Sequence, residues 1–173
     1  MRFVSATEID ATLSFPALIN AIADMFCTDI HVPVRHHHAI EHATGPLLLM
    51  PAWTEEEQEN FIGTKIVTVF PDNAKHGIPS VTGTYVLMSG ETGEPLAGFD
   101  GRMLTLWRTA AASALASVFL SHRDSHRLLL VGAGALSPYL ARAHASVRPI
   151  QEVSVWNRSS TRAEAVAADL HKE

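Results

Sequence analysis

The sequence predicts an α/β protein in which a sheet-rich N-terminal domain precedes the first part of a doubly wound parallel sheet. Three observations support this fold class. Short apolar runs separated by turn residues fill the region from Val32 to Asp100. An alanine-rich stretch without glycine or proline follows, near Met103 to Ser121. Strand and helix patterns then alternate, which is typical of β-α-β units. We therefore predict domains at residues 1–122 and 123–173.

In the N-terminal domain, a helical pattern runs through residues 14–27, with Ser14 as its cap and Pro16 in its first turn. Strands are expected after it because β-branched and apolar residues gather in short runs between turn signals. The short links between these runs predict an antiparallel or mixed sheet. The expected strands occupy residues 34–42, 46–53, 61–70, 81–89 and 95–99.

In the C-terminal domain, we expect a strand at 127–131, a helix at about 137–147, a strand at 152–156 and a helix at about 160–171. The first strand contains an unbroken apolar run, Leu128 to Val131, which predicts a strand covered on both faces. This order of elements is the opening of a doubly wound sheet.

A glycine-rich loop joins the first of these strands to its helix. Gly132 permits a tight turn, and Gly134 allows a pyrophosphate to approach the backbone at the helix N-terminus. Ser137 stands where the fingerprint has its third glycine, and it is small enough for close packing. The β-α-β context favours a dinucleotide site over a plain turn without ligand. The predicted loop residues are Gly132, Ala133, Gly134, Ala135 and Leu136.

The end of the second strand carries Asn157, Arg158 and Ser159 and has no carboxylate. An acidic residue here binds the ribose hydroxyls of NAD, whereas an arginine accommodates a 2′-phosphate. We therefore predict that NADP(H) is preferred and NAD(H) is second. The alternative interpretation is a solvated helix start capped by Ser159 or Ser160.

Three cations lie in apolar surroundings in the sequence: Arg35, Lys65 and Arg108. A buried cation needs an anionic partner. Internal acidic residues could supply it, or the long side chains could reach water. Three such cations ahead of a nucleotide loop favour the carboxylate of a small-molecule substrate. The histidines His36 to His38 and His42 predict no metal site, because alternate residues of a strand point to opposite faces and no cysteine or carboxylate cluster accompanies them.

Composition limits the partners and the location. The chain has 13 basic and 18 acidic residues, a net charge of −5 and no basic stripe, so we expect no nucleic-acid partner. The single cysteine fits a reducing compartment. The N-terminus lacks an apolar signal core, and no apolar run approaches the roughly 20 residues that a membrane span needs. We expect a cytoplasmic protein with no membrane partner.

These features together resemble the ornithine cyclodeaminase and mu-crystallin family. The resemblance rests on "PLLLMPAW", "GTKIVTVFPDNAKHGIPSVTGTYVL", "LTLWRTAAASALA" followed by "VGAG", and "VSVWNRSSTRAEAVA". It implies a substrate-binding N-terminal domain that pairs subunits into a homodimer, followed by a Rossmann NAD(P)-binding domain. It also implies that Lys65, Arg108 and Arg35 hold the substrate carboxylate, and that residues 157–159 contact the adenosine ribose or its phosphate.

The resemblance leaves the catalytic residue unassigned. The catalytic aspartate of family cyclodeaminases would lie beyond residue 173. The two predicted parallel strands also fall short of the five or six that a doubly wound sheet needs. We therefore expect this chain to be either a fragment of a longer protein or a truncated product.

Among the activities of the family, the sequence favours NAD(P)H-dependent reduction of a cyclic ketimine carboxylate, Δ1-pyrroline-2-carboxylate or Δ1-piperideine-2-carboxylate. Family cyclodeaminases tend to carry glutamate two residues before the Met-Pro pair, where this chain has Leu48. Leucine cannot neutralise the distal ammonium group of ornithine. The alternatives are an ornithine cyclodeaminase that uses NAD as a catalytic cofactor and a non-catalytic NADP-dependent binding protein like mu-crystallin.

Overall fold

A computed structural model describes residues 1–41, 45–55 and 60–172, without the side chain of Ala74. The chain forms two compact units, Met1–Thr12 with Met25–Thr105, and Leu13–Asp24 with Leu106–Glu173. The helix α3 (Gly101–Leu120) contributes its beginning to the first unit and the rest to the second. The compact units therefore divide the chain earlier than the domain boundary predicted near residue 122.

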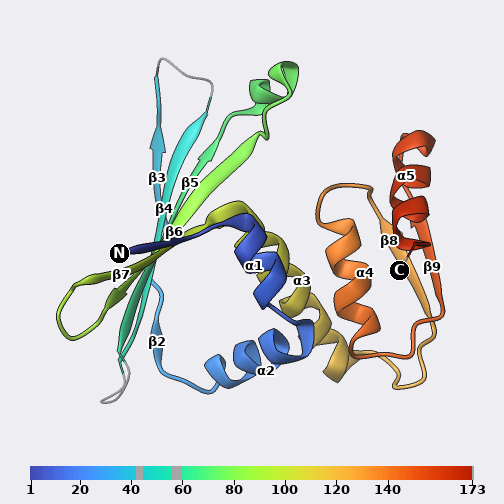
Figure 1. The fold of residues 1–173 in the computed structure, drawn as a ribbon, viewed down its shortest axis with the longest axis horizontal. Helices are drawn as coiled ribbons and strands as arrows, with labels where there is room; N and C mark the ends of the chain where they lie inside the picture. The colour runs from blue at the N-terminus through green and yellow to red at the C-terminus, as the bar shows by residue number, and fades with distance from the viewer. Residues whose placement is uncertain (42–44, 56–59, 173) are drawn as a thin grey trace. The chain divides into compact units, whose positions relative to one another are not determined.

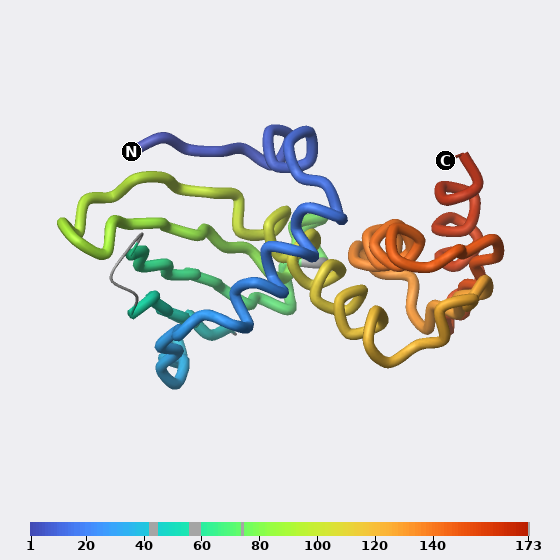
Figure 2. The backbone as a smooth tube through the Cα atoms, turned by 90° about the horizontal axis from the view of Figure 1, so that it is seen from below, coloured from blue at the N-terminus to red at the C-terminus, as the bar shows by residue number. Residues whose placement is uncertain are grey.

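The first unit is built on a mixed sheet of seven strands with the order β1-β7-β6-β5-β4-β2, in which β3 also pairs with β4. Neighbouring strands from β4 to β7 are antiparallel, and β1 is parallel to β7 (Figures 1 and 2). All five predicted strands are confirmed, and so is the mixed sheet. The strands are β1 (Arg2–Val4), β2 (Ile30–His31), β3 (His36–Ala39), β4 (Pro46–Thr54), β5 (Phe61–Val69), β6 (Val81–Ser89) and β7 (Pro95–Asp100).

Two short strands share the outer edge of β4. β3 pairs with its first half and β2 with its last two residues. Pro51, which has no N–H to donate, lies in the interval between these two pairings. Between β5 and β6 the chain forms a 3-10 helix, η1 (Pro71–His76).

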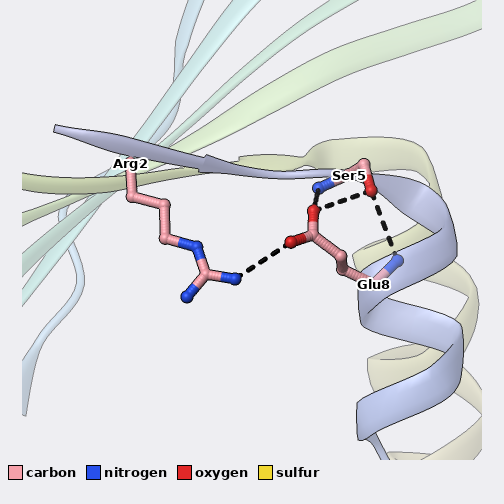
Figure 3. Close-up of polar contacts among 3 residues, drawn as sticks. All are labelled: Arg2, Ser5 and Glu8. Atoms are coloured by element: carbon pink, nitrogen blue, oxygen red, sulfur yellow. Dashed lines mark hydrogen bonds and ion pairs between the residues drawn. The ribbon is translucent and has the colours of Figure 1, made fainter.

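A short helix that was not predicted, α1 (Ala6–Thr12), begins with a capping box (Figure 3). The Glu8 N–H donates to Ser5 Oγ at 3.3 Å, and Glu8 Oε2 accepts hydrogen bonds from Ser5 N and Ser5 Oγ, both at 2.8 Å. Arg2 Nη2 donates to Glu8 Oε1 at 2.9 Å. These bonds, chiefly from the backbone of Ser5, lower the pKa of Glu8 to about 2. The motif Ser-x-x-Glu could have predicted this helix start.

Helices dominate the second unit. The predicted N-terminal helix is confirmed as α2 (Phe15–Met25), and the Ser14 carbonyl accepts its first hydrogen bond, from Leu18 N–H at 3.0 Å. The Phe15 ring stacks on Trp107 of α3 with centroids 4.4 Å apart. On α3, fully buried alanines let neighbouring helices approach closely. These alanines are Ala110, Ala111 and Ala114.

By length and composition, α3 could cross a membrane, which corrects the expectation that no apolar run approaches that length. The central helix of a soluble protein passes the same test. Trp107 and Leu115 are each 8% exposed, and Ala110, Ala111 and Ala114 between them are buried within the unit. One stripe of α3 therefore packs against the rest of its unit.

The remainder of the second unit confirms the predicted β-α-β-α order. β8 (Arg127–Val131) and β9 (Glu152–Trp156) are parallel, α4 (Ser137–Ala145) packs on β8, and α5 (Ser160–Leu170) packs on β9 and α4 (Figure 1). The prediction that β8 is covered on both faces is wrong for the described residues. Leu130 is 6% exposed, whereas Leu129 and Val131 are 63% and 72% exposed. The reason is that both helices pack on the same face of the two strands.

Candidate functional site

Lys65 lies in the middle of β5, on the more buried face of the sheet in the first unit. Its neighbours on the same face of the strand, Gly63 and Val67, are buried, while Lys65 itself is half-buried. Directly opposite it lie Met50 of β4 and Tyr85 of β6. The ammonium group therefore projects from a largely apolar part of the sheet.

Gly63, two residues before Lys65, is required at its position for a steric reason. A Cβ atom at Gly63 would collide with the Tyr85 hydroxyl, so only glycine lets the tyrosine ring lie across β5. The Phe99 ring contacts Tyr85 edge-on, with centroids 6.1 Å apart. Burial raises the pKa of Tyr85, so its hydroxyl stays protonated at neutral pH. Tyr85 was not predicted as part of this face, although an isolated glycine in a strand indicates close approach by another group.

A cavity of about 760 Å³ opens on this face of the sheet, within the first unit. Its size lies in the range of small-molecule sites. The Gly63 backbone and the Tyr85 ring contribute to its wall. Its other lining residues include Thr28, Ala52, Thr54, Phe61 and Leu87.

Leu48 lies on the same face as Lys65. It is opposite Val67 in the register of β4 and β5, two residues along the strands from Met50 and Lys65, which form the next pair on this face. Residues one pair apart on a face are diagonal neighbours within reach of a long side chain. At the position where family cyclodeaminases tend to have glutamate, the strand thus presents an apolar side chain beside the lysine.

The expectation that Arg35 and Arg108 are buried is wrong, because both are exposed. Arg35 precedes β3 in the first unit. Arg108 lies on α3 in the second unit, on a stripe with the exposed Ala112 and Ala116, while the adjacent Trp107 faces the core. Helical spacing aligned Arg108 with apolar residues, but it did not reveal which stripe packs inward.

The histidines lie on β3, where all three are exposed. His36 and His38 share one face, with ring centroids 6.4 Å apart, and His37 points to the other. His42 lies outside the described residues. Within the part of the chain that the structure describes, no three potential metal ligands gather.

The glycine loop connects β8 to α4 as predicted. Gly132 has a φ of +121°, which requires glycine. The Gly132 N–H donates to the Trp156 carbonyl of β9 at 2.7 Å. Ser137, 6% exposed, forms hydrogen bonds through its hydroxyl to both glycines of the loop. Its size was anticipated from the sequence, but its hydrogen bonds were not.

Asn157, Arg158 and Ser159 follow β9, and Arg158 and Ser159 are exposed. Asn157 Nδ2 donates to the Ser159 carbonyl at 3.1 Å. Ser159 occupies the N-cap position of α5 without a capping hydrogen bond from its side chain. Ser159 thus has the cap position that the alternative interpretation gave it, at an exposed helix start, but its hydroxyl makes no capping bond. Arg158 and the serine hydroxyl are presented to solvent at the strand end.

The chain matches the model of the ornithine cyclodeaminase/mu-crystallin family over residues 2–173. It is 38% identical over 175 residues to the Delta(1)-pyrroline-2-carboxylate reductase of Colwellia psychrerythraea, covering 98% of this chain and 54% of that protein. The chain thus spans about half the length of the curated relatives it matches.

Two solved structures are similar to this chain over nearly its whole length. Thermococcus litoralis Delta(1)-pyrroline-2-carboxylate reductase, in complex with NADH and L-proline, superposes with a TM-score of 0.89 at 28% identity, over 99% of this chain and 54% of that one. An archaeal alanine dehydrogenase dimer with bound NAD superposes with a TM-score of 0.87 at 25% identity, over 99% of this chain and 53% of that one.

Proposed function

The chain belongs to the ornithine cyclodeaminase/mu-crystallin family, and on that premise we propose that the intact protein is an NADPH-dependent reductase of cyclic 2-carboxy imines. The substrate is Δ1-pyrroline-2-carboxylate or Δ1-piperideine-2-carboxylate, and the product is proline or pipecolate. The names of the bacterial relative and of the Thermococcus structure support this reaction class. The dinucleotide, when bound, supplies the hydride.

The face around Lys65 is the observation that carries the proposal. A ring with one carboxylate brings an anion to the lysine and apolar atoms to Met50 and Leu48, which lie opposite and diagonal to it. Ornithine brings a distal ammonium group as well. Placing that charge beside Leu48 without a partner would be costly.

In this proposal, Lys65, Arg108 and Arg35 hold the substrate carboxylate. Their role is to orient the imine carbon toward the hydride donor, since positioning accounts for much of such a rate enhancement. The exposed guanidinium groups of Arg35 and Arg108 suit contact with a ligand. We assign no proton donor to the described residues.

The loop residues fit a nicotinamide dinucleotide. The positive φ of Gly132 and the short loop bring backbone N–H groups to the start of α4, where an anion is favoured. We propose a preference for NADP(H) because Arg158, with Asn157 and Ser159 beside it, suits a 2′-phosphate. Arg158→Ala should remove most of an affinity gap of about tenfold, the worth of one charge-assisted hydrogen bond. Equal affinities of the wild-type protein for NADPH and NADH in a fluorescence titration would reject the preference.

We also propose a homodimer in the cytoplasm. The dimer of the related alanine dehydrogenase supports the first point, and the single exposed cysteine, Cys27, supports a reducing compartment. Sedimentation of the intact protein tests the assembly.

A steady-state assay tests the reaction. The intact protein should oxidise NADPH with a cyclic 2-carboxy imine and release negligible ammonia from ornithine. Lys65→Ala and Arg108→Ala should both impair the reduction strongly. Leu48→Glu should weaken imine binding, because it adds an anion one pair from Lys65. Ammonia release from ornithine without imine reduction would establish the cyclodeaminase alternative, and dinucleotide binding without turnover would establish the binding protein.

A further inference from the structure

The Ser137 hydroxyl joins the two glycines of the loop. Ser137 Oγ donates to the Gly132 carbonyl at 3.0 Å and accepts from the Gly134 N–H at 3.1 Å. The Ser137 N–H donates to the Gly134 carbonyl at 3.0 Å. A single buried residue thus forms three hydrogen bonds across a turn that otherwise consists of glycine, alanine and leucine.

The direction of these bonds shows that the hydroxyl shapes the loop and not the helix. Ser137 is the first residue of α4, and the N-cap residue, Leu136, makes no side-chain capping bond. A capping serine would accept from N–H groups further along the helix. Ser137 instead reaches back along the chain to Gly132 and Gly134.

These hydrogen bonds also determine which backbone N–H groups are available to bind an anion. The N–H groups of Gly132, Gly134 and Ser137 are engaged, and Pro138 has none. Within the described residues, the amides of Ala133, Ala135 and Leu136 remain for a ligand. Without the hydroxyl, the Gly134 N–H and the Gly132 carbonyl would lose their partners, and the glycines would be free to adopt other conformations.

We propose that Ser137 is a positioning residue that holds the loop in its dinucleotide-binding conformation before the ligand arrives. This inference rests on the proposed dinucleotide site. A loop that is already ordered does not have to be ordered during binding, which favours affinity. The generic fingerprint asks only for a small residue at this position and does not itself require a hydroxyl.

Titration of the intact protein with NADPH tests the proposal. Ser137→Ala and Ser137→Gly should each raise the Kd about tenfold, as expected for hydrogen bonds lost from a preformed loop. The kcat at saturating cofactor and the KM for the imine should not change. Hydrogen exchange of the Gly134 amide, measured without ligand, should become faster in both variants.

Ser113→Ala is the matched control. It removes one hydroxyl hydrogen bond that α4 receives from α3, the 3.1 Å contact of Ser113 Oγ on α3 with His144 Nε2 on α4, without touching the loop. Its Kd for NADPH should equal that of the wild type. Unchanged affinity in both Ser137 variants, or an equal loss in Ser113→Ala, would overturn the proposal. If the wild-type protein binds no dinucleotide, the proposed function fails, and the exchange rate of Gly134 still tests the role of the hydroxyl.

Discussion

Replacing Arg148 with methionine tests how the helix α3 ends. The last four carbonyls of an α-helix have no partner within the helix. Arg148 Nη2 donates to two carbonyls in the last turn of α3, Ser117 O at 2.7 Å and Val118 O at 2.9 Å, and to Ser121 O at 3.2 Å. Ser117 O also accepts hydrogen bonds from Ser121 N at 3.0 Å and Ser121 Oγ at 2.9 Å. Arg148 Nε donates to Ser121 Oγ at 2.8 Å. Methionine keeps much of the apolar stem and removes these four contacts, together with the hydrogen bond from Arg148 Nη1 to the Val147 carbonyl at 2.7 Å.

The contacts of Arg148 determine how far Arg148→Met should lower the free energy of unfolding. A hydrogen bond contributes about 0.5–1.5 kcal/mol net, and water can replace the partner of a carbonyl that remains accessible, as at the exposed Val118. A cation at a helix C-terminus adds about 0.3–1 kcal/mol. We therefore expect Arg148→Met to lower the free energy of unfolding by about 2 kcal/mol. The corresponding fall in Tm is about 4–8 °C for a chain of this size.

Urea titration followed by tryptophan fluorescence measures the change, because Trp107 lies in the core of the same unit. Arg162→Met, on the exposed surface of α5, is the control and should be nearly neutral. A loss below about 0.5 kcal/mol for Arg148→Met, within the range of an ordinary surface substitution, would refute the reasoning.

Three further predictions concern other parts of the molecule. Burial, and then the nearby Arg148, lower the pKa of His144, so the unfolded chain binds more protons and stability should fall as the pH drops below about 6.5. His144→Gln should remove this contribution in unfolding titrations between about pH 7.5 and pH 5, and an unchanged slope would contradict it. The pKa of Glu8 is about 2, against an ordinary value of 4.5, so its carboxylate should stabilise α1 above pH 4.5 and lose this effect as the pH falls through about 2. An NMR titration that gives an ordinary pKa for Glu8 would disprove the capping box. Gly63→Ala should lower the free energy of unfolding by about 1–3 kcal/mol, because the new methyl group meets the Tyr85 hydroxyl. The loss should be smaller when Gly63→Ala is made in Tyr85→Phe, and equal losses in both backgrounds would exclude this contact.

Local patterns determined much of the fold. The strands at 127–131 and 152–156 match β8 and β9, and the five runs of the first unit all form strands. These predictions hold because apolar periodicity and turn residues act over a few neighbours. β1 and β2, with three and two residues, are too short to show a period. They form because β7 and β4 offer them an edge.

The cofactor loop could be located from the sequence, but its internal bonding could not. A strand, two spaced glycines and a helix start predicted the loop from local sequence alone. Where the Ser137 hydroxyl points depends on the rotamer and on the path of the backbone, which the spacing does not specify. The sequence therefore predicted a small residue, and the structure shows a residue with three hydrogen bonds.

Burial and cross-strand contacts were decided by the tertiary structure. The sequence by itself identified Lys65 and Arg108 as cations among apolar residues, yet only Lys65 is partly buried. Arg108 is exposed because the packing of α3 buries the stripe of Trp107, one residue away. The register of β5 and β6 pairs Tyr85 with Lys65, and the Tyr85 ring therefore reaches the diagonal Gly63, which is distant in the chain. Periodicity reports which residues share a face, whereas the partner of that face is set by elements distant in the chain.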